Sequence, residues 1–209
     1  MKKFILLFSA LIALQTQTAL MAQEEDEGEV IFNAILSGAF DIIVLPGGEI
    51  QTAWFNAADD YNFGISETIG VPGIDPGFTT VAMEATGNWF LKIGAPDFLP
   101  TGTEIGYIPI NNLGVWCEAT GVHQFGTEVT CSYQTADAAL GITNADATLI
   151  DLGTGNAGGQ ADNEFILHWL MGTMQGSMNP ESMFIQLAAG AFGMGTYNTT
   201  VVLTMTEIP

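Results

Sequence analysis

The apolar residues of this chain come in short runs that alternate with polar ones and end at glycine, proline, asparagine or aspartate. Alternation of this kind gives a β-strand one buried and one exposed face, and the bounding residues are typical of turns. No segment keeps a helical period over three turns. We therefore predict an all-β protein, an antiparallel two-sheet sandwich of about nine to eleven strands with almost no helix, and a closed barrel is the alternative.

The clearest strand patterns lie in the middle and at the end of the chain. Residues 78–86 and 89–93 form two rows around a Gly87-Asn88 turn, and their predicted core side chains are Thr79, Val81, Met83, Ala85, Trp89, Leu91 and Ile93. The run 164–171 is apolar on both faces, so both faces need cover. Further strands are predicted at 30–36, 39–45, 51–55, 148–152, 183–187 and 196–207, with a loop at 56–64 and a long surface excursion at 136–159 around residues 148–152.

The segment 111–134 carries the two cysteines of the chain. If its two alternating halves pair as an antiparallel hairpin centred near Gln124, Cys117 lies opposite Cys131 on the face that also carries Leu113 and Val129. This register predicts a disulfide between Cys117 and Cys131 that points into the core. Such a bond is typical of an oxidising compartment.

The beginning of the chain reads as a secretory signal. Two lysines precede an apolar run from Phe4 to Leu14, and small or neutral residues precede Gln23. The run is too short to span a bilayer. We expect a signal peptide at 1–22, an acidic flexible tail at 23–28 and a single β-sandwich domain at 29–209. The expected location is secreted, in the periplasm or at the cell surface, with no transmembrane segment.

The charge balance argues against nucleic acid as a partner. Removal of the signal leaves one lysine and no arginine against 23 acidic residues. Phosphate binding needs clustered cations, so nucleic acid is not an expected partner. The acidic residues are thinly spread, which favours a solvated surface that keeps copies of the chain apart.

No catalytic constellation is recognisable, and we predict that the protein is not an enzyme. Serine is scarce, and His123 and His168 have no triad context. No cofactor is expected, although calcium is a candidate because it takes oxygen ligands from loops. The candidate calcium ligands are Asp59, Asp60, Asp162 and Glu164. The aromatic residues Trp54, Phe55, Tyr61 and Phe63 have two interpretations, stacking on a sugar ring or filling the edge of the sandwich.

Two motifs resemble a broad group of secreted Bacteroidota-type β-sandwich surface proteins that includes fimbrial subunits. They are GTYNTTVVLTMTE at residues 195–207 and ADDYNFGIS at residues 58–66, and the signal ending in Ala22-Gln23 is also similar. The resemblance implies an immunoglobulin/pilin-like sandwich used for surface structure or adhesion. The cysteine-bearing segment is not part of that pattern.

We therefore expect a surface structural or adhesive subunit that self-associates or binds other cell-surface proteins. Filaments would form by strand addition, because an extended segment can pair with the sheet edge of a neighbouring copy. The assembly strand would expose one alternating row of side chains, Val30, Phe32, Ala34 and Leu36. The alternative is an extracellular module that binds carbohydrate or calcium through the loops near Asp59 and Asp162.

Overall fold

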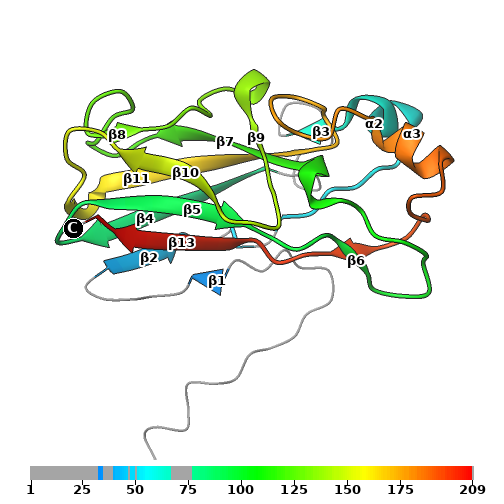
Figure 1. Ribbon diagram of the computed structural model, residues 1–209, viewed down its shortest axis with the longest axis horizontal. Coiled ribbons are helices and arrows are strands. Elements are labelled where there is room, and N and C mark those ends of the chain that lie inside the picture. The colour runs from blue at the N-terminus through cyan, green and yellow to red at the C-terminus, as the bar shows by residue number, and fades with distance from the viewer. Residues whose placement is uncertain (1–32, 35–39, 47, 50, 67–76, 209) are drawn as a thin grey trace, which may run out of the picture.

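The computed structural model describes residues 33–34, 40–46, 48–49, 51–66 and 77–208, and shows two sheets packed face to face (Figure 1). The predicted all-β sandwich is confirmed. There are more strands than predicted, because several are only two residues long. The strands are β1 (Asn33–Ala34), β2 (Phe40–Val44), β3 (Ile65–Ser66), β4 (Phe78–Ala85), β5 (Trp89–Gly94), β6 (Leu99–Pro100), β7 (Leu113–Ala119), β8 (Val129–Thr130), β9 (Leu140–Gly141), β10 (Ala147–Leu152), β11 (Gly158–Met171), β12 (Tyr197–Asn198) and β13 (Val202–Glu207).

One sheet has the order β2-β4-β11-β7-β9, and β3 pairs with the end of β11. The long strand β11 is its centre: Leu167 pairs with Thr79 of β4 on one side and with Cys117 of β7 on the other, both antiparallel. Both faces of this strand are covered by other parts of the protein, which explains why its sequence is apolar on both sides. Phe165, Leu167, Trp169 and Met171 face the main core, while Leu170 packs on the other side in a small cluster with Ala139 and Met178.

The second sheet has the order β1-β13-β5-β10-β8. Six residue pairs join β13 to β5 in antiparallel register, from Val202 with Gly94 to Glu207 with Trp89. On its other side β13 pairs in parallel with β1 at two positions, Asn33 with Val202 and Ala34 with Leu203. A separate two-stranded ribbon joins β6 to β12.

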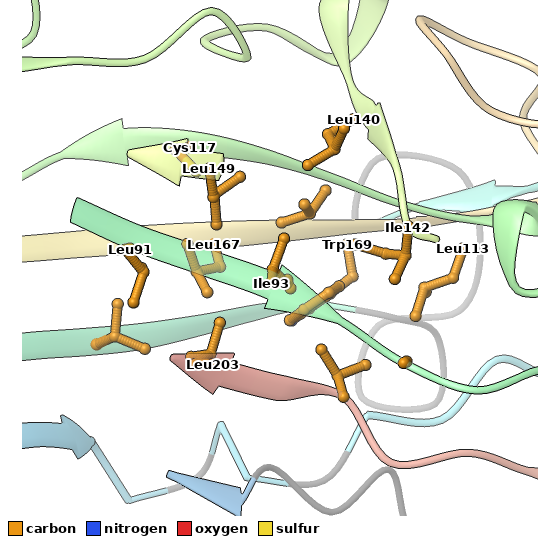
Figure 2. Packing of buried hydrophobic residues seen from close by; sticks show 14 of the residues in the cluster. Leu91, Ile93, Leu113, Cys117, Leu140, Ile142, Leu149, Leu167, Trp169 and Leu203 are labelled. Atoms are coloured by element: carbon orange, nitrogen blue, oxygen red, sulfur yellow. The ribbon is translucent and has the colours of Figure 1, made fainter. Parts of the chain in front are cut away.

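The core lies between the two sheets. Figure 2 shows Leu91 and Ile93 of β5, Leu203 of β13, and Leu167 and Trp169 of β11 in one packed layer, all of them buried. Every core side chain predicted for residues 78–93 is buried, which confirms that alternation identified the inward face of β4 and β5.

Three predictions of local structure are wrong. Residues 183–187 form a helix rather than a strand: α3 (Met183–Ala188) begins after Ser182, whose side chain accepts a hydrogen bond from the Ile185 amide at 3.3 Å. Part of the predicted loop 56–64 is α2 (Ala58–Phe63). Asp60 caps its start by accepting hydrogen bonds from the Asn56 and Ala57 amides at 2.9 and 2.7 Å. The predicted strand at 51–55 is extended chain outside both sheets.

The predicted hairpin over 111–134 is also wrong. β7 pairs with β11 and β9, whereas β8 pairs with β10 in the opposite sheet. Alternation identifies which face of a strand is buried, but it does not identify the partner strand. The chain after β7 follows the start of β11, with the Thr120 amide bonded to Glu164 O and the His123 amide to Asp162 O, and then crosses to the other sheet.

The predicted surface excursion at 136–159 is wrong as well, apart from its strand at 148–152. It contributes β9, β10 and the first residues of β11, and it includes the fully buried Ile142 and Asn156. The Asn156 side chain accepts a hydrogen bond from the Trp89 amide at 2.9 Å and donates one to Trp89 O at 2.8 Å. The Trp89 indole N–H donates to Asn156 O at 2.8 Å. These bonds fix the loop between β10 and β11 against the start of β5.

Candidate functional site: an apolar cavity at one end of the sandwich

A cavity of about 580 Å³ is lined by residues of α2 and α3 and by Phe98 next to β6. These elements gather at one end of the sandwich, on the right of Figure 1. The chain terminus after β13 lies at the opposite end. Binding sites for small molecules typically have volumes of about 300–1,000 Å³ and mostly apolar walls. The volume of this cavity falls in that range, so we take it as the candidate site.

The floor of the cavity is rigid core. It is formed by Trp169 and Met171 at the end of β11 and by Leu113 at the start of β7. The Trp169 indole N–H donates to Thr79 Oγ1 at 2.9 Å, and that hydroxyl donates to Gly48 O at 2.6 Å. The indole nitrogen is therefore satisfied within the protein, and its ring offers a hydrocarbon surface to the cavity.

Aromatic side chains form one wall. Phe55 and Tyr61 pack with their ring centroids 5.2 Å apart, and the Tyr61 hydroxyl donates to Phe55 O at 3.3 Å. Burial and then the nearby Asp60 charge raise the pKa of Tyr61. Trp54 also lines the cavity and is 58% exposed, so its ring is available at the mouth. Phe63, at 62% exposure, is on the same helix as Tyr61 but outside the lining.

The opposite wall comes from α3 and from the glycine-rich segment before β12. Met183 and Leu187 project from α3, and Phe192 and Met194 from the following segment. α3 is held by a buried reciprocal pair: Asn112 Nδ2 donates to Gln186 Oε1 at 3.0 Å, and Gln186 Nε2 donates to Asn112 Oδ1 at 2.8 Å. This wall is therefore fixed to the start of β7.

Two polar side chains that line the cavity, those of Gln51 and Tyr197, are engaged with the protein, and Thr52, Thr196 and Asn198 line it as well. The Gln51 side chain donates to Phe78 O at 3.2 Å and accepts from the Gly77 amide at 3.0 Å. The Tyr197 hydroxyl donates to Gly193 O at 2.9 Å and accepts from the Gly193 amide at 3.1 Å. The cavity thus presents mainly apolar surface, to which Thr52, Thr196 and Asn198 add polar side chains.

The lining residues carry no charge. Among the described residues the one lysine is Lys92 on β5, whose ammonium lies 5.1 Å from the centre of the Phe90 ring. The nearby charge is instead negative. Glu104 accepts hydrogen bonds from the Gly102 amide at 2.9 Å and the Thr196 amide at 3.5 Å. A hydrogen bond from its own backbone amide, and then these two bonds, lower the pKa of Glu104. An anionic ligand would find no cation here.

The four candidate calcium ligands do not come together. Asp59 and Asp60 lie on α2, which leads into β3 beside the Leu170–Met171 end of β11, whereas Asp162 and Glu164 lie near the start of that strand. Asp162 accepts a hydrogen bond from the Gly159 amide at 3.0 Å, and Glu164 accepts one from Thr120 Oγ1 at 3.0 Å. No cluster of three metal-binding side chains occurs within the described ranges.

The two cysteines lie close together although the predicted hairpin is absent. The Cys117 amide donates to Tyr133 O at 2.7 Å, which places Cys131 beside β7. Burial raises the pKa of the Cys117 thiol well above its ordinary value, and its hydrogen bond with Cys131 adds to that shift. The same hydrogen bond lowers the pKa of Cys131. Both thiols are free in this structure, so the disulfide stays a prediction.

The two histidines have local partners. His123 Nδ1 lies 2.9 Å from the side-chain oxygen of the buried Asn163. The His168 ring stacks on Trp116 with a centroid distance of 3.7 Å, and its Nε2 is 3.4 Å from a Glu118 oxygen. Neither ring lines the cavity. Of the predicted assembly strand, Ala34 belongs to β1, while Val30, Phe32 and Leu36 lie outside the described residues.

The sequence indicated part of the cavity and missed the rest. The aromatic cluster near residue 55 was identified, but Phe98, Trp169 and Phe192 are brought to it by the fold from distant segments. No helix in the described part of the chain is long and apolar enough to cross a membrane. Neither a protein-family model nor a curated protein matches this sequence.

Proposed function

We propose that the protein is a secreted surface subunit that self-associates by exchange of its N-terminal strand. The observation that carries this proposal is the pairing of β1, which meets β13 in parallel at two residue pairs, whereas β13 meets β5 at six. Within the described residues, these two pairs are the strand contacts that hold the N-terminal segment to its own domain. A second copy can supply the same segment to the same edge of β13.

The physical basis is the side of β13 that pairs with β1. Within the described residues, Thr204 to Glu207 are paired with β5 but not with β1. Unpaired backbone groups along a sheet edge bind an added strand, and alternate side chains then set its register. The alternating row Val30, Phe32, Ala34 and Leu36 has the spacing that such an added strand requires.

The test compares chains with and without the N-terminal segment. Deleting residues 23–36 should abolish self-association while leaving a folded domain. Ala34→Pro should weaken it strongly, because proline removes the ladder N–H, and Ala34→Val is the matched control that preserves strand pairing. Light scattering after gel filtration and electron microscopy measure the assemblies. Filaments from the truncated chain, or a strictly monomeric full chain at high concentration, would contradict the proposal.

A further inference from the structure

The apolar cavity is independent of the proposed strand exchange. It is lined by residues 51–55, by α2 and α3 and by the segment 192–198, none of which belongs to β1 or β13. What the cavity binds is therefore a separate question from how copies of the chain self-associate.

Three observations limit what the cavity can hold. Its volume of about 580 Å³ fits a small organic molecule rather than a single solvent cluster. Its lining carries no charged side chain, and Glu104 lies beside the rim at Thr196. Burying an anion here would remove its hydration without supplying a cation, which is strongly unfavourable. A neutral ligand is the class that these charges favour.

The hydrogen-bonding groups of the lining distinguish between two classes of neutral ligand, sugars and aromatic molecules. A sugar needs several free donors and acceptors to replace its bonds to water. Gln51, Tyr61 and Tyr197 each use their side-chain polar groups on the protein itself. The side chains of Thr52, Thr196 and Asn198 also line the cavity, but most of the available surface is aromatic and thioether, in particular the exposed Trp54 ring and Met194. Aromatic faces and methionine sulfur both make favourable contacts with aromatic rings.

We propose that this cavity binds an uncharged, largely apolar small molecule with an aromatic body, which enters between Trp54 and Met194. The exposed ring of Trp54 stacks on the ligand, and the buried surface of Trp169 and Leu113 forms the end wall. Leu187 of α3 contributes to the opposite wall.

The test uses two probes that differ by one charge. N-phenyl-1-naphthylamine is neutral, and 8-anilinonaphthalene-1-sulfonate has the same ring system with an added sulfonate. The neutral probe should bind the purified full chain with a saturable rise in fluorescence, and the anionic probe should bind at least about tenfold more weakly because its charge is desolvated without a partner. Absence of saturable binding by the neutral probe, or equal affinity for both probes, would overturn the proposal.

Variants locate the bound probe. Trp54→Ala should weaken binding of the neutral probe by about five- to tenfold through the lost ring contact. Phe63→Ala is the matched control, because Phe63 has a similar exposure on the neighbouring helix but lies outside the lining, and it should leave affinity unchanged. Leu187→Trp should fill the cavity and remove binding. Trp54→Ala changes an exposed residue, so it remains informative even if Leu187→Trp fails to fold.

Two results would point elsewhere. Equal binding by the wild type, Trp54→Ala and a folded Leu187→Trp would show that the probe occupies another surface. Displacement of the probe by a neutral oligosaccharide would show that the cavity binds a carbohydrate and not an aromatic ligand. Both results overturn the assignment.

Discussion

Asn156 offers the sharpest test of how this sandwich is held together. Its side chain makes two hydrogen bonds to the backbone of Trp89, 67 residues away, and both residues are fully buried. Replacing Asn156 by alanine leaves the Trp89 amide and carbonyl without these partners. The indole bond to Asn156 O involves main chain and survives the substitution.

The expected loss follows from those two groups. A buried polar group deprived of its partner costs about 1–3 kcal/mol, so two such groups suggest a decrease of about 3–4 kcal/mol in the free energy of unfolding after partial relaxation. For a domain of this size, that corresponds to a fall of about 6–16 °C in Tm. Urea unfolding followed by tryptophan fluorescence measures the free energy, with the slope unchanged if the transition stays two-state.

A matched control variant distinguishes the loss of buried hydrogen bonds from the effect of replacing any asparagine by alanine. Asn144 is an exposed asparagine in the loop before β10, and Asn144→Ala should change stability by less than about 0.5 kcal/mol. A loss below about 1 kcal/mol for Asn156→Ala would refute the reasoning. It would mean that water replaces the side chain at Trp89, or that the loop between β10 and β11 contributes little to folding.

Two further predictions concern titratable groups. In the reduced protein, iodoacetamide should label the partly exposed Cys131 well before the buried Cys117, because burial raises the pKa of Cys117 while the hydrogen bond from Cys117 lowers the pKa of Cys131. Equal labelling rates would contradict this. A disulfide formed on oxidation should add about 3 kcal/mol to the free energy of unfolding, for a loop of about 15 residues. Glu104 has a folded pKa below its ordinary value of 4.5, so its hold on Gly102 and Thr196 should be present above pH 4.5 and lost as pH falls through the lowered value. Hydrogen exchange at the Thr196 amide, corrected for intrinsic rates, should rise in acid and in Glu104→Gln, and unchanged protection would contradict the assignment.

Alternation predicted the faces of strands but not their partners. Val115, Cys117 and Val129 are all buried, as their shared face required, yet β7 and β8 lie in opposite sheets. A period of two depends on the local backbone alone. Pairing depends on contacts between distant segments, such as Leu167 with Cys117, and no local pattern encodes those contacts.

The wrong assignment at 183–187 has a different cause. A run of five residues is too short for its apolar pattern to distinguish a strand from a helix. The helix is decided by Ser182, which caps the Ile185 amide, and by Gln186, which the fold pairs with Asn112. The cap could be read from the sequence. The Asn112 partner could not, because it is 74 residues away.

Part of the exposed apolar surface lies at the cavity. Ten large hydrophobic side chains are exposed among the described residues, and two of them, Trp54 and Met194, line the cavity. Scattered apolar residues on a surface need no explanation, whereas a contiguous apolar group would indicate an interaction site. The high net negative charge of the chain counteracts unspecific association through such a group. An acidic surface and an apolar end are therefore compatible in one protein: like charges keep copies apart in general, while a specific neutral ligand can still reach the cavity because it carries no charge to be repelled.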